Sequence, residues 1–274
     1  METSVTATPI SQVFQRTRAA GQMAFMPFVT AGDPDLDTTC EVIDRLALAG
    51  VDLIEVGVPY SDPVADGPVI QASYTRALES GFTLARFFET FRAADRSAWP
   101  PLVAMVSYSI IFRYGAERFL DAARDAGFAG FIVPDLPGDE AQDLAALVRQ
   151  RNLDLVELLS PLTPPDRVPR ILANGSGFVY CIAVAGTTGE RDALPTALTN
   201  QLSELKKQTD LPLAVGFGVS RPEHIEALRG RADGAIVGSA IVRRFEQIAV
   251  APDRTLDEIQ QFASDMVAAC HAAR

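Results

Sequence analysis

The chain has 274 residues, of which 48% are hydrophobic, so it can bury a large core as one domain or two. Its net charge of −11, with no basic stripe to offset it, argues against a nucleic-acid-binding surface. No run approaches the roughly 18 apolar residues of a membrane span, and the polar first residues predict no signal peptide.

The three cysteines, Cys40, Cys181 and Cys270, are far apart and lack the spacing of metal ligands. We therefore expect reduced thiols in a cytoplasmic protein.

Short apolar runs alternate with longer amphipathic segments along the whole chain. The runs predict strands at 24–30, 52–58, 102–107, 130–133, 154–159, 177–183, 213–216 and 234–237. The segments between them predict helices at 36–49, 84–94, 116–126, 140–151, 166–173, 196–209, 222–228 and 239–245.

This alternation predicts an α/β fold, a (β/α)8 TIM barrel. No linker interrupts the rhythm, so residues 1–274 are expected to form a single domain, with residues 1–13 as a flexible or short helical N-terminal extension. An open doubly wound sheet is the alternative, but the glycine-rich turn expected after its first strand is absent.

Histidine and lysine are scarce. The only histidines are His224 and His271, and the only lysines are the neighbours Lys206 and Lys207 in a polar, helix-like stretch. Imidazole bases, histidine metal sites and Schiff-base lysines are therefore not expected. Any chemistry should depend on carboxylates, tyrosines and backbone amides, without a metal.

Glu55 interrupts the apolar run 53–58. A buried strand normally reads as continuous Val, Ile and Leu, and an acid there loses hydration worth several kcal/mol. Because side chains alternate, Glu55 shares a face with Leu53 and Gly57, and we expect the glycine to leave room for a ligand. The alternative is a core acid satisfied by hydrogen bonds.

The predicted barrel also locates a site, because chemistry in such barrels occurs at the C-terminal ends of the strands. The loops there contain Asp33, Asp62, Asp66 and Asp135, and Glu55 should lie deeper in the barrel mouth. Asp62 and Asp66 could instead be turn formers, because Ser-Asp-Pro and Ala-Asp-Gly are ordinary turn sequences.

Three turns of small residues in the last third of the chain predict a phosphate site. They are 186–189 (GTTG), 216–220 (GFGVS) and 237–240 (VGSA), and the last two end the seventh and eighth strands. Glycines let backbone N–H groups approach an anion, and a helix N-terminus adds partial positive charge. Barrel phosphate sites commonly use these two loops, so a small phosphorylated metabolite is the expected ligand.

With these motifs assembled, the chain resembles the tryptophan synthase alpha chain family. The resemblance is carried by residues 27–34 (PFVTAGDP), 55–68 (EVGVPYSDPVADGP), 134–137 (PDLP), 186–189, 216–218 (GFG) and 238–240 (GSA), in family order from about Phe14 onward.

The resemblance implies a lyase that cleaves indole-3-glycerol phosphate to indole and glyceraldehyde 3-phosphate in tryptophan biosynthesis. It implies that Glu55 is the general acid/base, that Asp66 holds the indole N–H and that Tyr180 lines the site. Further implied roles are ring packing by Phe28 and Phe217, and phosphate binding by Gly189, Gly218, Gly238 and Ser239. Thr188, next to Gly189, is a further substrate-binding residue on the same resemblance. Without the resemblance, Tyr180 could be a packing residue of its strand.

The resemblance also implies that the alpha chain holds no cofactor of its own. Family members pair with a pyridoxal-phosphate beta chain in an α2β2 assembly and pass indole to that beta chain. Asp135 matches a position at that interface. Residues 185–192 are expected to form a lid.

The chain departs from the family pattern at Ser107-Tyr108-Ser109, Val184-Ala185 and Gly138, so the coupling to a beta chain is less clearly implied than the lyase chemistry.

Three rival functions stay open at this point. A stand-alone lyase would release free indole. A sugar-phosphate isomerase or epimerase would share the phosphate loops, but it more often needs a His, Lys or metal ligand. A ligand-binding subunit without catalysis would be natural if Glu55 or Asp66 were replaced, and both are present.

Overall fold

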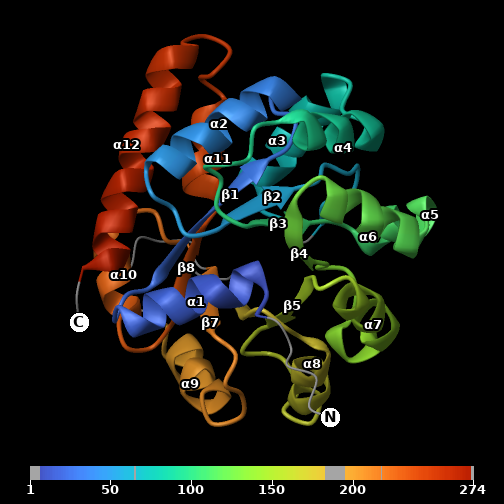
Figure 1. Ribbon diagram of the computed structural model, residues 1–274. Coiled ribbons are helices and arrows are strands. Elements are labelled where there is room, and N and C mark those ends of the chain that lie inside the picture. Colours follow the sequence, from blue (N-terminus) through green and yellow to red (C-terminus); the bar gives the residue numbers. More distant parts are fainter. Residues whose placement is uncertain (1–6, 65, 183–194, 217, 273–274) are drawn as a thin grey trace.

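The fold is a closed barrel of parallel strands in chain order (Figure 1), which confirms the predicted fold class. The computed structural model describes residues 7–64, 66–182, 195–216 and 218–272. The strands are β1 Ala24–Thr30, β2 Ile54–Gly57, β3 Leu102–Met105, β4 Phe128–Ile132, β5 Asp154–Leu159, β6 Val179–Ile182, β7 Leu213–Gly216 and β8 Gly234–Val237.

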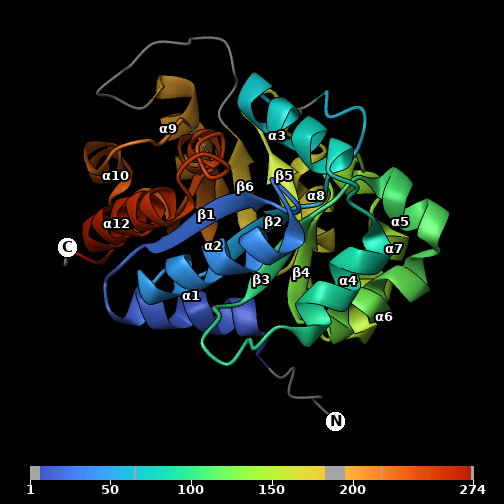
Figure 2. The same cartoon turned by 90° about the horizontal axis from the view of Figure 1, so that it is seen from above.

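Helices surround the barrel on its outer side, and the first of them covers one end of it (Figures 1 and 2). They are α1 Pro9–Ala19, α2 Leu36–Leu48, α3 Pro68–Glu79, α4 Leu84–Ala93, α5 Tyr108–Tyr114, α6 Ala116–Asp125, α7 Gln142–Gln150, α8 Val168–Asn174, α9 Thr196–Leu205, α10 Pro222–Leu228, α11 Ser239–Phe245 and α12 Pro252–His271, with a 3₁₀ turn at Gly138–Glu140. No helix within the described ranges combines the length and the apolar character needed to cross a membrane.

Helices α3 and α5 were not predicted. The buried stripe of α3 consists of Ile70, Ser73, Tyr74 and Ala77, which has helical spacing but includes two polar side chains. This composition hides the amphipathic pattern, and Pro68, which the sequence places in the acidic loop, is the first residue of α3.

The strands have two distinct faces, as their alternation predicts. Ile54, Val56 and Val58 pack in the outer layer between the strands and the helices. Leu53 belongs instead to the cluster that fills the barrel interior. Glu55 is paired in register with Phe28 of β1 and Val103 of β3, so these side chains share the interior face.

Helix α1 closes the N-terminal end of the barrel. Its Ile10, Val13 and Phe14 join the interior cluster, and the ring of Phe14 lies 5.4 Å from that of Phe178. Thr8 caps the helix and donates a hydrogen bond of 2.6 Å to Asp154 in β5. A ligand therefore has access to the barrel interior from the opposite end, where the strands finish.

Candidate active site

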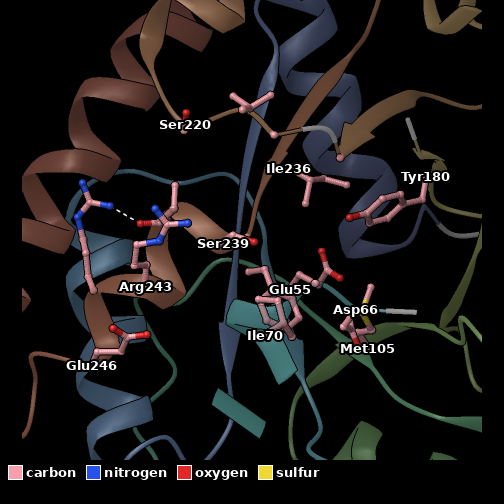
Figure 3. Close-up of a pocket in the computed structure, with 18 of the residues that line it drawn as sticks. Glu55, Asp66, Ile70, Met105, Tyr180, Ser220, Ile236, Ser239, Arg243 and Glu246 are labelled. Atoms are coloured by element: carbon pink, nitrogen blue, oxygen red, sulfur yellow. Dashed lines mark hydrogen bonds between the residues drawn. The ribbon is translucent and has the colours of Figure 1, made fainter. Parts of the chain in front are cut away.

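A cavity of about 990 Å³ lies at the C-terminal ends of the strands. Its lining comes from strands and loops that are far apart in the sequence, as the close-up in Figure 3 shows. It brings together seven of the residues that the sequence analysis singled out: Phe28, Glu55, Asp66, Tyr180, Gly218, Gly238 and Ser239.

Glu55 is the most buried acid of this cavity. Only 2% of the residue is exposed, and its Oε1 atom has no hydrogen-bond partner among the described residues. Burial, followed by the negative charge of Asp66, raises the pKa of the Glu55 carboxyl to about 8. The carboxyl group is therefore mostly protonated at neutral pH, and it can donate a proton into the cavity.

Gly57 does not make room for a ligand, contrary to the expectation from its place beside Glu55. A Cβ atom at this position would overlap the ring of Phe28 and the hydroxyl of Tyr74. The glycine therefore allows Phe28 to pack with Tyr74 and with Ile70 of α3. The correction has a physical reason, because side chains from β1 and α3 fill the space that the missing Cβ leaves.

Asp66 lies on the loop between β2 and α3 and is less buried than Glu55. Its backbone N–H donates to the Pro63 carbonyl at 3.0 Å, and its own carbonyl accepts a 2.8 Å bond from the Gln71 amide. The Asp66 carboxylate has no hydrogen-bond partner among the described residues. Burial raises its pKa to about 6, so the carboxylate is mostly ionised at neutral pH.

Tyr180 projects from β6 into the cavity and also packs against the interior cluster. Its ring lies over Gly216 of the neighbouring strand, where a Cβ atom would overlap the tyrosine hydroxyl. Burial raises the pKa of Tyr180 well above its ordinary value, and the charges of Glu55 and Asp66 raise it further. The hydroxyl is therefore a neutral hydrogen-bonding group close to both acids.

Backbone amides after β7 and β8 also line the cavity. Gly218 has a φ of +44°, which favours glycine, in the loop after β7. Helix α11 begins at Ser239, directly after Gly238. The N–H groups of Ser239 and Ala240 donate to none of the described residues, so they can bind an anion.

The other predicted residues lie elsewhere. Thr188, Gly189 and Phe217, like the expected lid at 185–192, lie outside the described residues. Asp135 lies in a separate groove of about 700 Å³, which also includes Asp62. There it accepts hydrogen bonds from the Ser107 hydroxyl at 2.6 Å and the Tyr108 N–H at 2.7 Å, so it joins the loop after β4 to the start of α5.

Several lining residues were not foreseen. Ile70 belongs to the unpredicted α3, whereas Met105 and Ile236 follow by strand alternation from Val103 and Gly234 and could have been found by extending that pattern. Arg243 and Arg244 of α11 also line the cavity, and no sequence signal distinguishes them from ordinary surface arginines.

The chain is similar to known proteins over nearly its full length. The family model described as "Tryptophan synthase alpha chain" matches residues 14–271. A tryptophan synthase alpha chain of Rhodopirellula baltica is 46% identical over 271 residues, which cover 97% of this chain and 98% of the relative. One from Prochlorococcus marinus is 45% identical over 264 residues, covering 96% and 95%.

Solved structures give the same result. The structure of Mycobacterium tuberculosis tryptophan synthase superposes with a TM-score of 0.87 at 31% identity, covering 97% of this chain and 100% of that chain. The crystal structure of a tryptophan synthase alpha chain from Legionella pneumophila has a TM-score of 0.85 at 29% identity, covering 96% and 97%.

Proposed function

This chain belongs to the tryptophan synthase alpha chain family and is a lyase of tryptophan biosynthesis, and from that premise we propose that it cleaves indole-3-glycerol phosphate to indole and glyceraldehyde 3-phosphate. The observation that carries the proposal is the buried Glu55 carboxyl, which has an unpartnered oxygen, a pKa of about 8 and a cavity in front of it.

Glu55 supplies both proton transfers. As a carboxylic acid it protonates C3 of the indole, which leaves the ring as a cationic indolenine. As the resulting carboxylate it accepts the proton of the hydroxyl on the carbon attached to C3. The bond between that carbon and C3 then breaks, its electron pair restores the neutral indole, and the other fragment leaves as the aldehyde.

Asp66 stabilises the charge that develops on the ring. An ionised carboxylate beside the indole N–H favours the cationic indolenine over the neutral indole, and a pKa of about 6 keeps Asp66 ionised at neutral pH. Tyr180 lines the cavity near both acids, where its hydroxyl can hold the substrate. The protonated ring is itself the electron sink, so the scheme requires neither a lysine nor a metal.

The ends of β7 and β8 hold the phosphate. The N–H groups of Ser239 and Ala240, which donate to none of the described residues, together with Gly218 and Gly238, provide amide donors in the lining of the cavity. Phe28, packed with Ile70 and Tyr74, provides an apolar surface for the indole ring. We include Thr188, Gly189 and Phe217 among the binding residues on the sequence resemblance alone.

The experiment is an assay of glyceraldehyde 3-phosphate release from indole-3-glycerol phosphate by the isolated chain. We expect Glu55→Gln to lose the activity, because an amide neither donates nor accepts the proton, while Glu89→Gln, an exposed and conservative change, retains it. Absence of cleavage by the wild type, with and without an added beta chain, would refute the lyase assignment for this chain.

We also propose that a pyridoxal-phosphate beta chain binds over the groove that contains Asp62 and Asp135, in an α2β2 assembly. Two exposed apolar side chains lie on the neighbouring elements: Val64 is 89% exposed and Phe112 is 72% exposed. Tyr60 lines this groove and also packs against the cluster of Phe28, Ile70 and Tyr74, two members of which line the cavity.

Indole would pass to the beta chain at that point.

The three cysteines are free thiols, which agrees with a proposed cytoplasmic location. A large increase in the cleavage rate on adding a beta chain is expected; an unchanged rate would favour a stand-alone lyase that releases indole.

A further inference from the structure

The cavity contains charges that oppose a phosphorylated ligand. Asp66 and Glu246 are acidic lining residues beside the mostly protonated Glu55, in a chain of net charge −11. Among the described residues, the cationic side chains that line the cavity are Arg243 and Arg244, which are neighbours on α11. They differ in what they contact.

Arg244 packs against α12 and bonds to its own helix. Its Nη1 donates to the Ala240 carbonyl, and its guanidinium lies 4.3 Å from the ring centroid of Phe262 on α12. Burial lowers the pKa of Arg244. Its role is therefore to hold α11 against α12.

Arg243 is exposed and makes no hydrogen bond or ion pair with any residue that the structure describes. It follows Ser239 by four positions, so the two side chains share one face of α11. Helical side chains point back toward the N-terminus of their helix, which directs the guanidinium toward the turn that begins at Ser239. Figure 3 shows the side chain there, at the rim of the cavity.

From this placement we propose that Arg243 is a positioning residue that binds the phosphate group of the ligand from the rim of the cavity. The inference rests on the proposed function for the identity of the ligand. The backbone amides after β7 and β8 provide directional donors at the base of the site, and the guanidinium adds a full positive charge on the solvent side. A planar guanidinium can bind two phosphate oxygens at once.

The test measures binding of glycerol 3-phosphate and of phosphate-free indole by calorimetry, together with KM and kcat for indole-3-glycerol phosphate. The variants are Arg243→Gln and Arg243→Lys. Arg254→Gln, which removes an exposed charge paired with Glu258 on α12, is the matched control.

We expect Arg243→Gln to weaken glycerol 3-phosphate binding about fivefold, as for loss of one partly exposed charge contact. KM should rise by a similar factor, with the loss falling on KM rather than kcat and with indole affinity retained. The affinity should also depend less steeply on salt. Arg243→Lys should restore part of the binding, because it keeps the charge but not the two-pronged geometry of the guanidinium, and the control should match the wild type.

Equal glycerol 3-phosphate affinities for wild type and Arg243→Gln would overturn the inference. A loss of indole binding by Arg243→Gln as large as its loss of glycerol 3-phosphate binding would also overturn it, because it would indicate structural damage. Failure of the wild type to bind glycerol 3-phosphate would overturn it as well. If the wild type binds this ligand through Arg243 but cleaves no indole-3-glycerol phosphate, the proposed function fails and the phosphate contact stands.

Discussion

Glu55 illustrates at the scale of one residue how the site trades stability for chemistry. A buried polar atom without a partner costs about 1–3 kcal/mol. Among the described residues, Glu55 Oε1 in the cavity has no partner, and neither has the hydroxyl of Tyr74 beside Phe28. The shape of the barrel holds these groups in place, and under the proposed function a bound substrate would provide a partner for Glu55 Oε1.

The first prediction is that Glu55→Gln stabilises the chain at alkaline pH. The pKa of Glu55 rises from 4.5 to about 8 on folding, so the folded state holds a proton that the unfolded state releases. The stability contributed by that proton is complete below about pH 4.5 and is lost as pH rises to about 8. The glutamine side chain of Glu55→Gln does not titrate, so the variant keeps this stability at high pH.

Urea unfolding should therefore give Glu55→Gln a higher free energy of unfolding than the wild type at pH 9, by about 3 kcal/mol. At pH 5 the difference between the two proteins should be small. Asp66 and Glu157 also have raised pKa values, but both proteins contain them, so their contributions cancel. The exposed Glu89→Gln is the control, and a pH-independent difference would contradict the interpretation.

The second prediction concerns the pH profile of kcat/KM. The proposed mechanism requires ionised Asp66 and protonated Glu55, whose pKa values are about 6 and about 8. We expect a bell-shaped profile with its maximum near neutral pH, whose limbs belong to the coupled pair. Asp66→Asn should lower kcat/KM about 100-fold and remove the acid limb; a profile that keeps this limb would assign it to another group.

At the scale of elements, the acidic loop depends on how α3 is attached to β1. Asp33, just after β1, is 1% exposed, and Arg76 of α3 donates to both of its carboxylate oxygens, at 3.0 and 2.6 Å. Ser73 of the same helix donates to Asp33 as well. The loop that carries Asp66 leads directly into α3, so this ion pair also fixes one side of the cavity.

The third prediction is that Arg76→Ala destabilises the chain by about 3 kcal/mol, because it leaves the buried Asp33 carboxylate without its cation. Arg254→Ala, which breaks the exposed pair with Glu258, should cost less than about 1 kcal/mol. Both are measured by chemical denaturation. Adding Asp33→Asn to Arg76→Ala should recover part of the loss, and additive losses would show that the pair is not coupled.

At the scale of the whole molecule, the open end of the barrel provides two adjoining spaces. The cavity of about 990 Å³ holds the two acids, and the groove of about 700 Å³ lies beside it over the ends of β2 to β4. Helix α1 seals the opposite end, so a ligand reaches the acids from this face of the barrel, the face on which we also propose that the beta chain binds.

The fourth prediction is that Phe112→Ser weakens binding of a beta chain about tenfold, because burying an exposed aromatic ring contributes to association. The melting temperature of the isolated chain should stay the same, since the ring is exposed. Affinity is measured by titrating a labelled beta chain. Leu48→Ser, another exposed apolar side chain but on α2, serves as the control, and equal affinities for both variants would argue against this face.

The sequence by itself determined the barrel, because apolar runs and amphipathic segments alternate with the periods that strands and helices require. It also identified Glu55, since a carboxylate in a continuous apolar run has few structural explanations, and it placed Gly218, Gly238 and Ser239 at the ends of their strands. These conclusions depend on local periodicity, which fixes the face on which a side chain lies.

The tertiary structure decided what fills each space. Only packing shows that Phe28 and Tyr74 occupy the room over Gly57, that Tyr180 lies over Gly216, and that Asp135 joins two loops. It also distinguishes Arg243, which pairs with none of the described residues, from Arg244, which lies over the ring of Phe262. These features depend on side chains that are distant in sequence, and a local pattern carries no information about which distant residue packs against it.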